Sequence, residues 1–247
     1  MPPCVRRFER TIPVHVLERE ADLTRTQREG LGKIETLTLL GVAQETTTRI
    51  PATTETDRRI DAVLFVRASL GNTRALESTA TVVHACFPHP SVLILENARG
   101  DVCLSAALTS RRKRATGFAV NAMEADSDIG SWRRTEQGKA FLSSLAFETL
   151  DQRSLAHLTQ DIMARIRLAR VARLVGFYPD PGLCRTPDVV AVIERLLECQ
   201  GRQDRLRARW KAHGTTQRER LRLRIPLSEA IDQTKAAVDE LTRRCGR

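Results

Sequence analysis

The sequence predicts an α+β protein, with an N-terminal mixed α/β sheet domain over residues 1–125 and a mainly helical region over residues 136–247 that has a short coiled-coil-like end. Short runs of β-branched and apolar residues fill the first half and are typical of strands. Helical periodicity fills the second half. The hydrophobic share of 41% is enough for a core, and the aromatic share of 4% indicates a core made mostly of aliphatic side chains.

The N-terminal half is expected to contain strands at its apolar, β-branched runs. Thr24 fits the N-cap of a short helix that reaches Gly30. The segment at residues 44–56 is rich in Thr and contains a proline, which predicts a long loop. The predicted strands are residues 34–43, 60–67, 91–96, 101–108 and 118–123.

A helix is expected between the second and third strands, from about Asn72 to Ala85. The prolines within residues 87–90 end it, because proline cannot continue a helix. Residues 97–100 form a turn, so the strands on either side of it are expected to form a hairpin. A basic loop at residues 111–114 leads to the last strand.

The second half is expected to be helical at residues 140–150 and 154–174, with a loop at residues 176–185. Thr186 and Pro187 then form a helix start signal, a cap followed by proline in the first turn. This helix is expected to reach about Ala212. Its expected inner stripe is apolar at the start of the helix and polar in the middle. The stripe is formed by Val189, Ile193, Leu196, Gln200, Gln203 and Trp210, with Leu206 beside it.

The pattern changes period after that helix. Residues 220–225 alternate strictly between Arg and an apolar residue, which predicts an extended strand with three arginines on one face. Pro226 and Ser228 predict the start of a last helix. A seam with coiled-coil spacing is expected from Leu227, Ile231, Thr234, Val238 and Leu241.

The positive charge of the chain is concentrated in residues 202–224, here called the basic strip. The chain has a formal net charge of +10, and the strip holds eight arginines and one lysine against Asp204 and Glu219. A local basic surface is what an anionic partner would contact. The candidate nucleic-acid-binding residues are Arg202, Arg205, Arg207, Arg209, Lys211, Arg218, Arg220, Arg222 and Arg224.

Two interpretations of the basic strip stay open. Contact with the phosphate backbone of DNA or RNA needs only a row of positive charge. Alternatively, the strip is a solvated surface or pairs with an acidic face of a partner subunit. Stacking on bases is not expected, because Trp210 is the only aromatic residue in the strip.

No metal, cofactor or catalytic residue is predicted. His84, Cys86 and His89 are residue types that bind zinc, but no second cluster supplies a fourth ligand. We therefore expect a core thiol and two histidines in a turn. The chain contains neither a phosphate-binding loop of the G-x-x-x-x-G-K-[ST] type nor a G-x-S-x-G elbow.

A metal-dependent nuclease is the alternative from another functional class. Restriction-type nucleases hold magnesium with an Asp and a Glu-x-Lys on adjacent strands. Asp61, Glu96 and Asp101 lie at predicted strand ends, but Ala98 stands where the lysine is needed. The expectation is carboxylates that face water.

The expected location is cytoplasmic. No run of 18 apolar residues suggests a membrane span, and charges stand where a secretion signal would need apolar residues. The six cysteines are far apart and form no C-x-x-C pair, so free thiols are expected.

The order of these elements resembles the bacterial family described as domain of unknown function 4391. The matching features are Ile12 with Pro13, the helix-to-strand passage at residues 23–34, the Pro-x-Pro turn at residues 87–90, the buried strand at residues 92–95, and the extended piece and last helix at residues 220–241. The family usually has an aromatic residue between the two prolines, where this chain has His89.

The resemblance implies a genomic context rather than a mechanism. Such proteins often accompany helicase-like and DNA-methyltransferase genes in restriction or antiphage loci. We therefore expect a non-enzymatic accessory subunit of a bacterial defence system, which contacts nucleic acid or a helicase or methyltransferase partner through the basic strip. The other alternative is a scaffold that forms homo-oligomers through the seam of the last helix.

Overall fold

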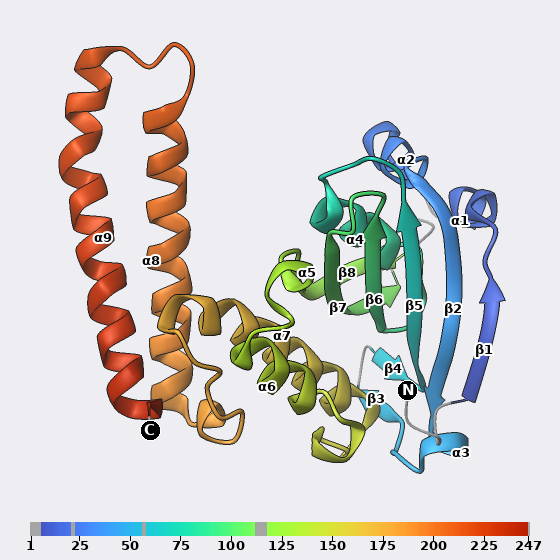
Figure 1. The fold of residues 1–247 in the computed structure, drawn as a ribbon. Coiled ribbons are helices and arrows are strands. Elements are labelled where there is room, and N and C mark those ends of the chain that lie inside the picture. Colours follow the sequence, from blue (N-terminus) through green and yellow to red (C-terminus); the bar gives the residue numbers. More distant parts are fainter. Residues whose placement is uncertain (1–5, 21–22, 56–57, 112–117, 247) are drawn as a thin grey trace. The chain divides into compact units, whose positions relative to one another are not determined.

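The structure is a computed structural model, and it describes residues 6–20, 23–55, 58–111 and 118–246. The chain divides into two compact units, residues 1–169 and 170–247. The first unit holds a six-stranded sheet and its helices, and the second holds the two longest helices (Figure 1). The predicted α+β class is confirmed.

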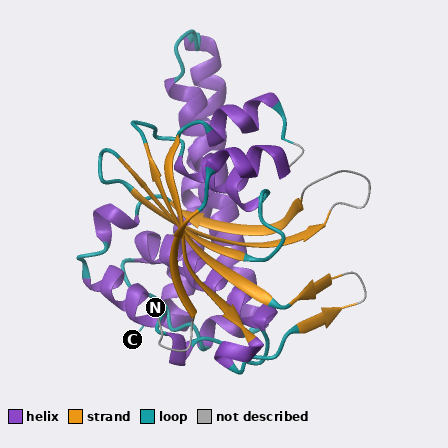
Figure 2. Ribbon diagram, turned by 90° about the vertical axis from the view of Figure 1, so that its right-hand side faces the viewer, coloured by secondary structure: helices purple, strands orange, loops and turns teal. Residues whose placement is uncertain are grey.

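The sheet of the first unit has the strand order β1-β2-β5-β6-β7-β8. β5 and β6 are parallel, and the other neighbouring pairs are antiparallel. A parallel pair needs a crossover, which α4 (Leu76–His84) supplies. The fan of strands in Figure 2 is the twist usual for a sheet. The strands are β1 (Arg6–Thr11), β2 (Ile34–Gln44), β5 (Ala62–Leu70), β6 (Ser91–Asn97), β7 (Val102–Arg111) and β8 (Phe118–Asp126).

The main core lies between one face of this sheet and the helices α1 (Val14–Glu20), α2 (Arg25–Leu31) and α4. Alternate residues of the strands point to this face, as strand geometry requires. Leu31 and Val83 of the helices are completely buried against Leu93 and Leu95 of β6. The predicted N-cap is confirmed, because Thr24 accepts a hydrogen bond from the Gln27 amide in a capping box.

The opposite face of the sheet carries a second set of contacts. Ala125 of β8 belongs to the main core, whereas the adjacent Glu124 points the other way and pairs with Arg167 at 2.6 Å. Arg167 lies on α7 (Leu155–Val175). The other elements on this part of the chain are α5 (Ile129–Trp132), α6 (Glu136–Ser144) and the short helix η1 (Phe147–Thr149).

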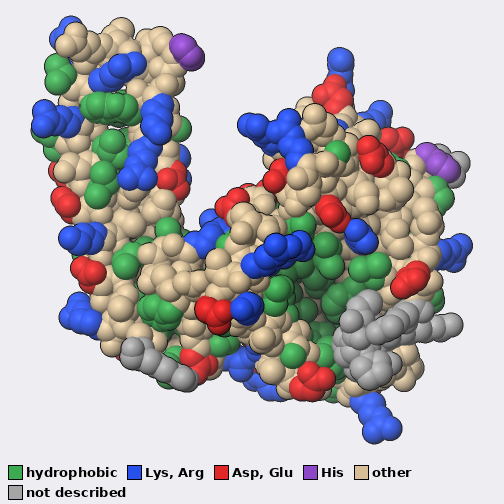
Figure 3. All heavy atoms as spheres, viewed as in Figure 1, with side chains coloured by type: hydrophobic (Ala, Val, Ile, Leu, Met, Phe, Trp, Pro, Cys, Tyr) green, Lys and Arg blue, Asp and Glu red, His purple; other side chains and the backbone are tan. Residues whose placement is uncertain are grey.

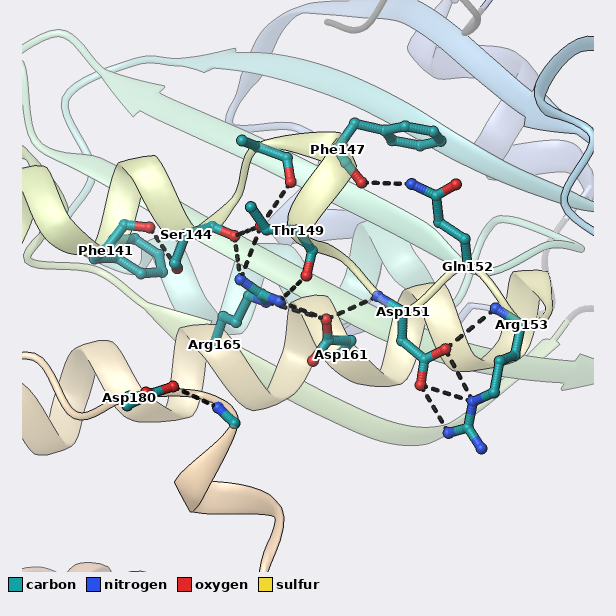
Figure 4. A network of polar contacts seen from close by, with 12 residues as sticks. Phe141, Ser144, Phe147, Thr149, Asp151, Gln152, Arg153, Asp161, Arg165 and Asp180 are labelled. Carbon is teal, nitrogen blue, oxygen red and sulfur yellow. Dashed lines mark hydrogen bonds and ion pairs between the residues drawn. The ribbon is translucent and has the colours of Figure 1, made fainter. Parts of the chain in front are cut away.

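A buried arginine fastens α7 to α6 and η1 (Figure 4). The Arg165 side chain is almost fully buried and donates to Asp161 Oδ2 at 2.8 Å through Nη2. It also donates to the carbonyl oxygens of Ser144 and Thr149. Asp161 Oδ2 also accepts from the Asp151 amide at 3.0 Å. The network therefore satisfies two buried charges and the carbonyls at the ends of α6 and η1 together.

One predicted segment of the first unit is wrong, and another lies almost wholly outside the described residues. The loop expected at residues 44–56 contains α3 (Glu45–Thr48) and β3 (Thr53–Glu55), which pairs with β4 (Arg58–Ile60). Gln44 supplies the cap of α3, and Arg49 ends it in the left-handed region with φ of 61°. The basic loop at residues 111–114 lies outside the described residues, except for Arg111, which ends β7.

The second unit is dominated by an antiparallel pair of helices, α8 (Pro187–Lys211) and α9 (Gln217–Cys245), here called the hairpin. The short helix η2 (Leu183–Arg185) leads into α8. Within the part of the chain that the structure describes, no helix is both long and apolar enough to cross a membrane.

Candidate nucleic-acid interface

The basic strip occupies the end of the hairpin that carries the α8–α9 turn. Pro187 in the first turn and Asp188 beside it start α8 as predicted. The turn needs Gly214, whose φ of 93° is strained for other residues. Thr215 Oγ1 closes the turn by donating to the Arg209 carbonyl at 2.8 Å. The strip therefore folds into two helix ends held close by one short turn.

The strand predicted for residues 220–225 is wrong, because these residues lie inside α9. A capping box starts the helix: Thr216 Oγ1 accepts from the Glu219 amide, and Glu219 Oε2 accepts from the Thr216 amide at 2.8 Å. Alternation of Arg and Leu produces a strand only where another strand pairs with it, and α8 offers none. The helix continues through Pro226, at a cost of about 3 kcal/mol.

Packing against α8 explains why α9 persists beyond that proline. The inner stripe of α8 is buried at Val189, Val192, Ile193, Leu196 and Gln203. The inner stripe of α9 is buried at Ala230, Thr234, Ala237, Leu241 and Cys245. Burial of such stripes, rather than helix propensity, supplies most of a helix's stability in a protein.

The residues of α9 that face α8 differ in part from those of the predicted seam. Thr234 and Leu241 face α8 as expected, but Ile231 is 39% exposed and small alanines take the inner positions. Small residues allow two helices to approach closely, so the larger Leu227 and Val238 lie at the border, half-buried. The α9 seam is thus used inside one chain, in its pairing with α8.

A ladder of polar pairs with a seven-residue step runs along one broad face of the hairpin. Arg195 forms an ion pair with Glu240, and this hydrogen bond lowers the pKa of Glu240. One step further, Arg202 Nη1 lies 3.5 Å from Gln233 Oε1, a neutral partner. The next step leads to Arg209 on α8 and to Pro226 on α9. From the first pair to the second, the partner of the arginine therefore changes from a carboxylate to a neutral amide.

This ladder explains why positive charge accumulates at one end of the hairpin. At the other end, Arg244 contacts Glu240 at 3.0 Å and Asp188 at 3.9 Å. In the strip, the two acids are engaged locally: Asp204 accepts from Gln200 at 3.0 Å, and Glu219 caps α9. The hydrogen bond from Thr216 lowers the pKa of Glu219, with help from the charges of Arg209 and Arg222.

All nine predicted binding residues are brought together on this end of the hairpin, and all nine side chains are exposed. Lys and Arg crowd the upper part of the hairpin in Figure 3, and acidic side chains begin further down. Two shallow hollows mark the face of the ladder, here called the ladder face. One, of about 340 Å³, lies at the turn between Arg209 and Arg222, and one, of about 510 Å³, lies between Arg195 and Gln233.

The outer edge of α9 adds an apolar pair among these charges. Leu221 is 61% exposed and Ile225 is 68% exposed, one helical turn apart. Trp210 is half-buried. The surface of the strip therefore consists of exposed guanidinium groups around a small apolar edge, which suits contact with phosphates rather than stacking on bases.

The possible zinc ligands do not converge. His84 is buried, with Nδ1 at 2.6 Å from Ser91 Oγ and Nε2 at 2.9 Å from Ser105 Oγ, and burial lowers its pKa to about 3. Cys86 donates to a backbone carbonyl, and burial raises its pKa to about 12. His89 Nδ1 lies 3.3 Å from Asp61. The described residues contain no cluster of His, Cys, Asp or Glu suited to a metal ion.

The possible nuclease carboxylates are also apart. Glu96 on β6 lies beside Ser69 in the parallel register, eight residues after Asp61, which is about 26 Å along the strand. Glu96 forms an ion pair with Arg67 at 2.7 Å. Asp101 accepts from the Asn97 side chain at 2.8 Å. Asp61 and Glu96 therefore cannot hold one metal ion between them.

Comparison with known proteins identifies a family but no characterised relative. One family model, described as a domain of unknown function (DUF4391), matches residues 3–230. Searches among curated proteins and among solved structures gave no match.

Proposed function

The chain belongs to the DUF4391 family, and from the charge and geometry of its hairpin we propose that it binds the phosphate backbone of nucleic acid with the basic strip. The observation that carries this proposal is the gathering of nine exposed basic side chains at one end of the hairpin. The two acids there are occupied by Gln200 and by the α9 cap. The strip therefore presents a net positive surface.

The residue type supports phosphate as the ligand. Eight of the nine basic residues are arginines, whose planar fork donates two hydrogen bonds to a phosphate. Each neutralised phosphate releases condensed counterions, so binding weakens as salt rises. Nine contacts would set an upper limit of about −8 for the slope of log K against log salt on duplex DNA.

We extend the proposal to a biological role. In it, the protein is a non-enzymatic accessory subunit of a bacterial restriction-like or antiphage system and works beside a helicase or a DNA methyltransferase in the cytoplasm. The support is the separation of the candidate catalytic carboxylates and the family context. Co-purification from a host that expresses the neighbouring genes tests this part, and recovery of the protein without either enzyme would speak against it.

The binding proposal is tested by fluorescence anisotropy on a labelled 24-base-pair duplex at several salt concentrations. Changing Arg220, Arg222 and Arg224 together to Glu should weaken binding at least tenfold and flatten the salt dependence. The matched control changes Arg133, Arg134 and Lys235 to Glu, with the same change in net charge at exposed positions outside the strip.

The control should bind within about threefold of the unchanged protein, because screened charges outside the interface add little. Circular dichroism should show equal helix content in both variants. An equal loss of affinity in the two variants would mean that the net charge of the protein, and not the strip, determines binding. Unchanged binding by the strip variant at every salt concentration would refute the proposal.

A further inference from the structure

The basic residues of the strip lie on both broad faces of the hairpin. Successive residues of a helix are turned by about 100°, so residues two apart point to nearly opposite sides. On α9, Arg222 lines the hollow of the ladder face, together with Arg209 of α8. Arg220 and Arg224 therefore lie on the opposite face. Because residues 220–225 are helical, their alternating sequence places the arginines on two different faces of the hairpin.

The same division holds on α8. Arg202 and Arg209 are seven residues apart and share the ladder face. Lys211 follows Arg202 by nine positions, about two and a half turns, and points to the opposite face. Arg207 lies one turn before Lys211 and one turn after the buried Gln203, so it lies between the inner stripe and the opposite face. One acid accompanies each face, Glu219 on the ladder face and Asp204 on the other.

Each broad face thus has at least three basic residues. By helical spacing, the ladder face has Arg202, Arg209, Arg218 and Arg222, and the opposite face has Lys211, Arg220 and Arg224, with Arg207 at its inner border. Arg205 lies at the outer edge of α8. A hairpin with one basic face would suit a flat anionic surface, whereas two basic faces suit a ligand with two anionic walls.

The dimensions of the hairpin fit between such walls. Across its broad faces the hairpin is one helix thick, about 10–12 Å with side chains. The major groove of B-form DNA is about 12 Å wide and 8.5 Å deep. The basic part of α8, residues 202–211, is about 15 Å long, so the turn can reach the floor of the groove while the arginines remain level with the phosphates.

We infer that the end of the hairpin inserts into the major groove of B-form double-stranded DNA, with the phosphates of one strand against the ladder face and those of the other strand against the opposite face. This inference rests on the proposed binding of nucleic acid by the strip. Single-stranded nucleic acid has no second wall. Double-stranded RNA has a deep and narrow major groove that does not admit a helix.

Comparison of ligands tests the inference first. Anisotropy is measured on a B-form DNA duplex, an RNA duplex of the same sequence, the single strand, and anionic vesicles of phosphatidylserine and phosphatidylcholine. The DNA duplex should bind at least tenfold more tightly than either RNA or the single strand at the same salt. A DNA duplex whose major groove is filled by bulky C5 substituents on its pyrimidines should bind as weakly as RNA.

Paired variants test the two walls. Arg209→Gln with Arg222→Gln neutralises the ladder face, and Arg220→Gln with Arg224→Gln neutralises the opposite face. Both pairs should weaken duplex binding by a similar factor and lower the salt slope by about two each. Arg133→Gln with Lys235→Gln removes the same charge at exposed positions outside the strip; this pair is the control and should bind within about threefold of the unchanged protein.

The outcomes separate this inference from the binding proposal. If only one of the two paired variants weakened binding, the hairpin would lie on the surface of the duplex. This result would overturn insertion and leave the proposal of nucleic-acid binding intact. Equal affinity for DNA, RNA and single strands would do the same. Binding to vesicles in preference to every nucleic acid, or binding to none of the ligands, would overturn both.

Discussion

Breaking the buried Arg165–Asp161 pair should destabilise the first unit strongly. Arg165→Met retains most of the side chain's length and removes its charge. Asp161, whose side chain is 6% exposed, then remains as a buried carboxylate, and the Ser144 and Thr149 carbonyls lose their donor. Removal of one partner of a buried pair costs about 3–5 kcal/mol. This is a large part of the about 5–15 kcal/mol by which a protein is stable.

The control is the same substitution at an exposed pair. Arg153 donates to Asp151 at 2.7 Å, but its side chain is 72% exposed, so Arg153→Met should cost less than about 1 kcal/mol. Arg165→Lys should lie between the two, because a single ammonium group cannot replace the fork that reaches four acceptor atoms on Asp161, Ser144 and Thr149.

Urea unfolding monitored by tryptophan fluorescence measures these differences. The chain has two tryptophans, and a Trp210→Phe background leaves the buried Trp132, which stacks on Phe141 of α6, as the reporter for the first unit. The reasoning would be refuted if Arg165→Met changed the free energy of unfolding by less than 1 kcal/mol, or if Arg153→Met cost as much.

Three further changes test other features of the fold. Pro226→Ala should stabilise the hairpin by up to about 3 kcal/mol in urea unfolding, and a loss of stability would show that a kink there is needed. Burial keeps His84 neutral, with a pKa of about 3. The unfolded chain protonates near pH 6.5, so stability should fall by about 2 kcal/mol from pH 7 to pH 5, and His84→Gln should abolish this fall. Gly138→Ala should destabilise α6, because a Cβ would lie 2.3 Å from the Trp132 carbonyl oxygen. Gly201→Ala should stabilise α8 by about 1 kcal/mol, because a Cβ there would meet only a flexible arginine side chain. Thermal unfolding measures both variants, and a shift of the two melting temperatures in the same direction would contradict this.

Elements with local and consistent signals could be predicted from the sequence. The strand at Ser91–Asn97 is an apolar, β-branched run between turn residues, and the burial of Leu93 and Leu95 in the main core agrees with it. β1 could not be predicted, because its charged sequence becomes a strand only by pairing with β2. Its residue Glu9 even has a positive φ of 46°.

The candidate interface was predicted in composition but not in shape. Its nine basic residues lie together as expected, but alternation at residues 220–225 predicts a strand, whereas the capping box of Thr216 and Glu219 starts a helix there. The seven-residue spacing of Arg195, Arg202 and Arg209 is also visible in the sequence. Their changing partners on α9 could not be identified until the register of the two helices was known.

The antiparallel register of the hairpin makes its length adjustable in fixed increments. Each step of the ladder takes seven residues on α8 and seven on α9, about 10.5 Å along the axis. Inserting one heptad into each helix below the strip would move the arginines outward by that distance and keep the seam in phase. An insertion in one helix alone would break the register. Relatives with longer or shorter hairpins should therefore differ by about fourteen residues in total, divided equally between the two helices.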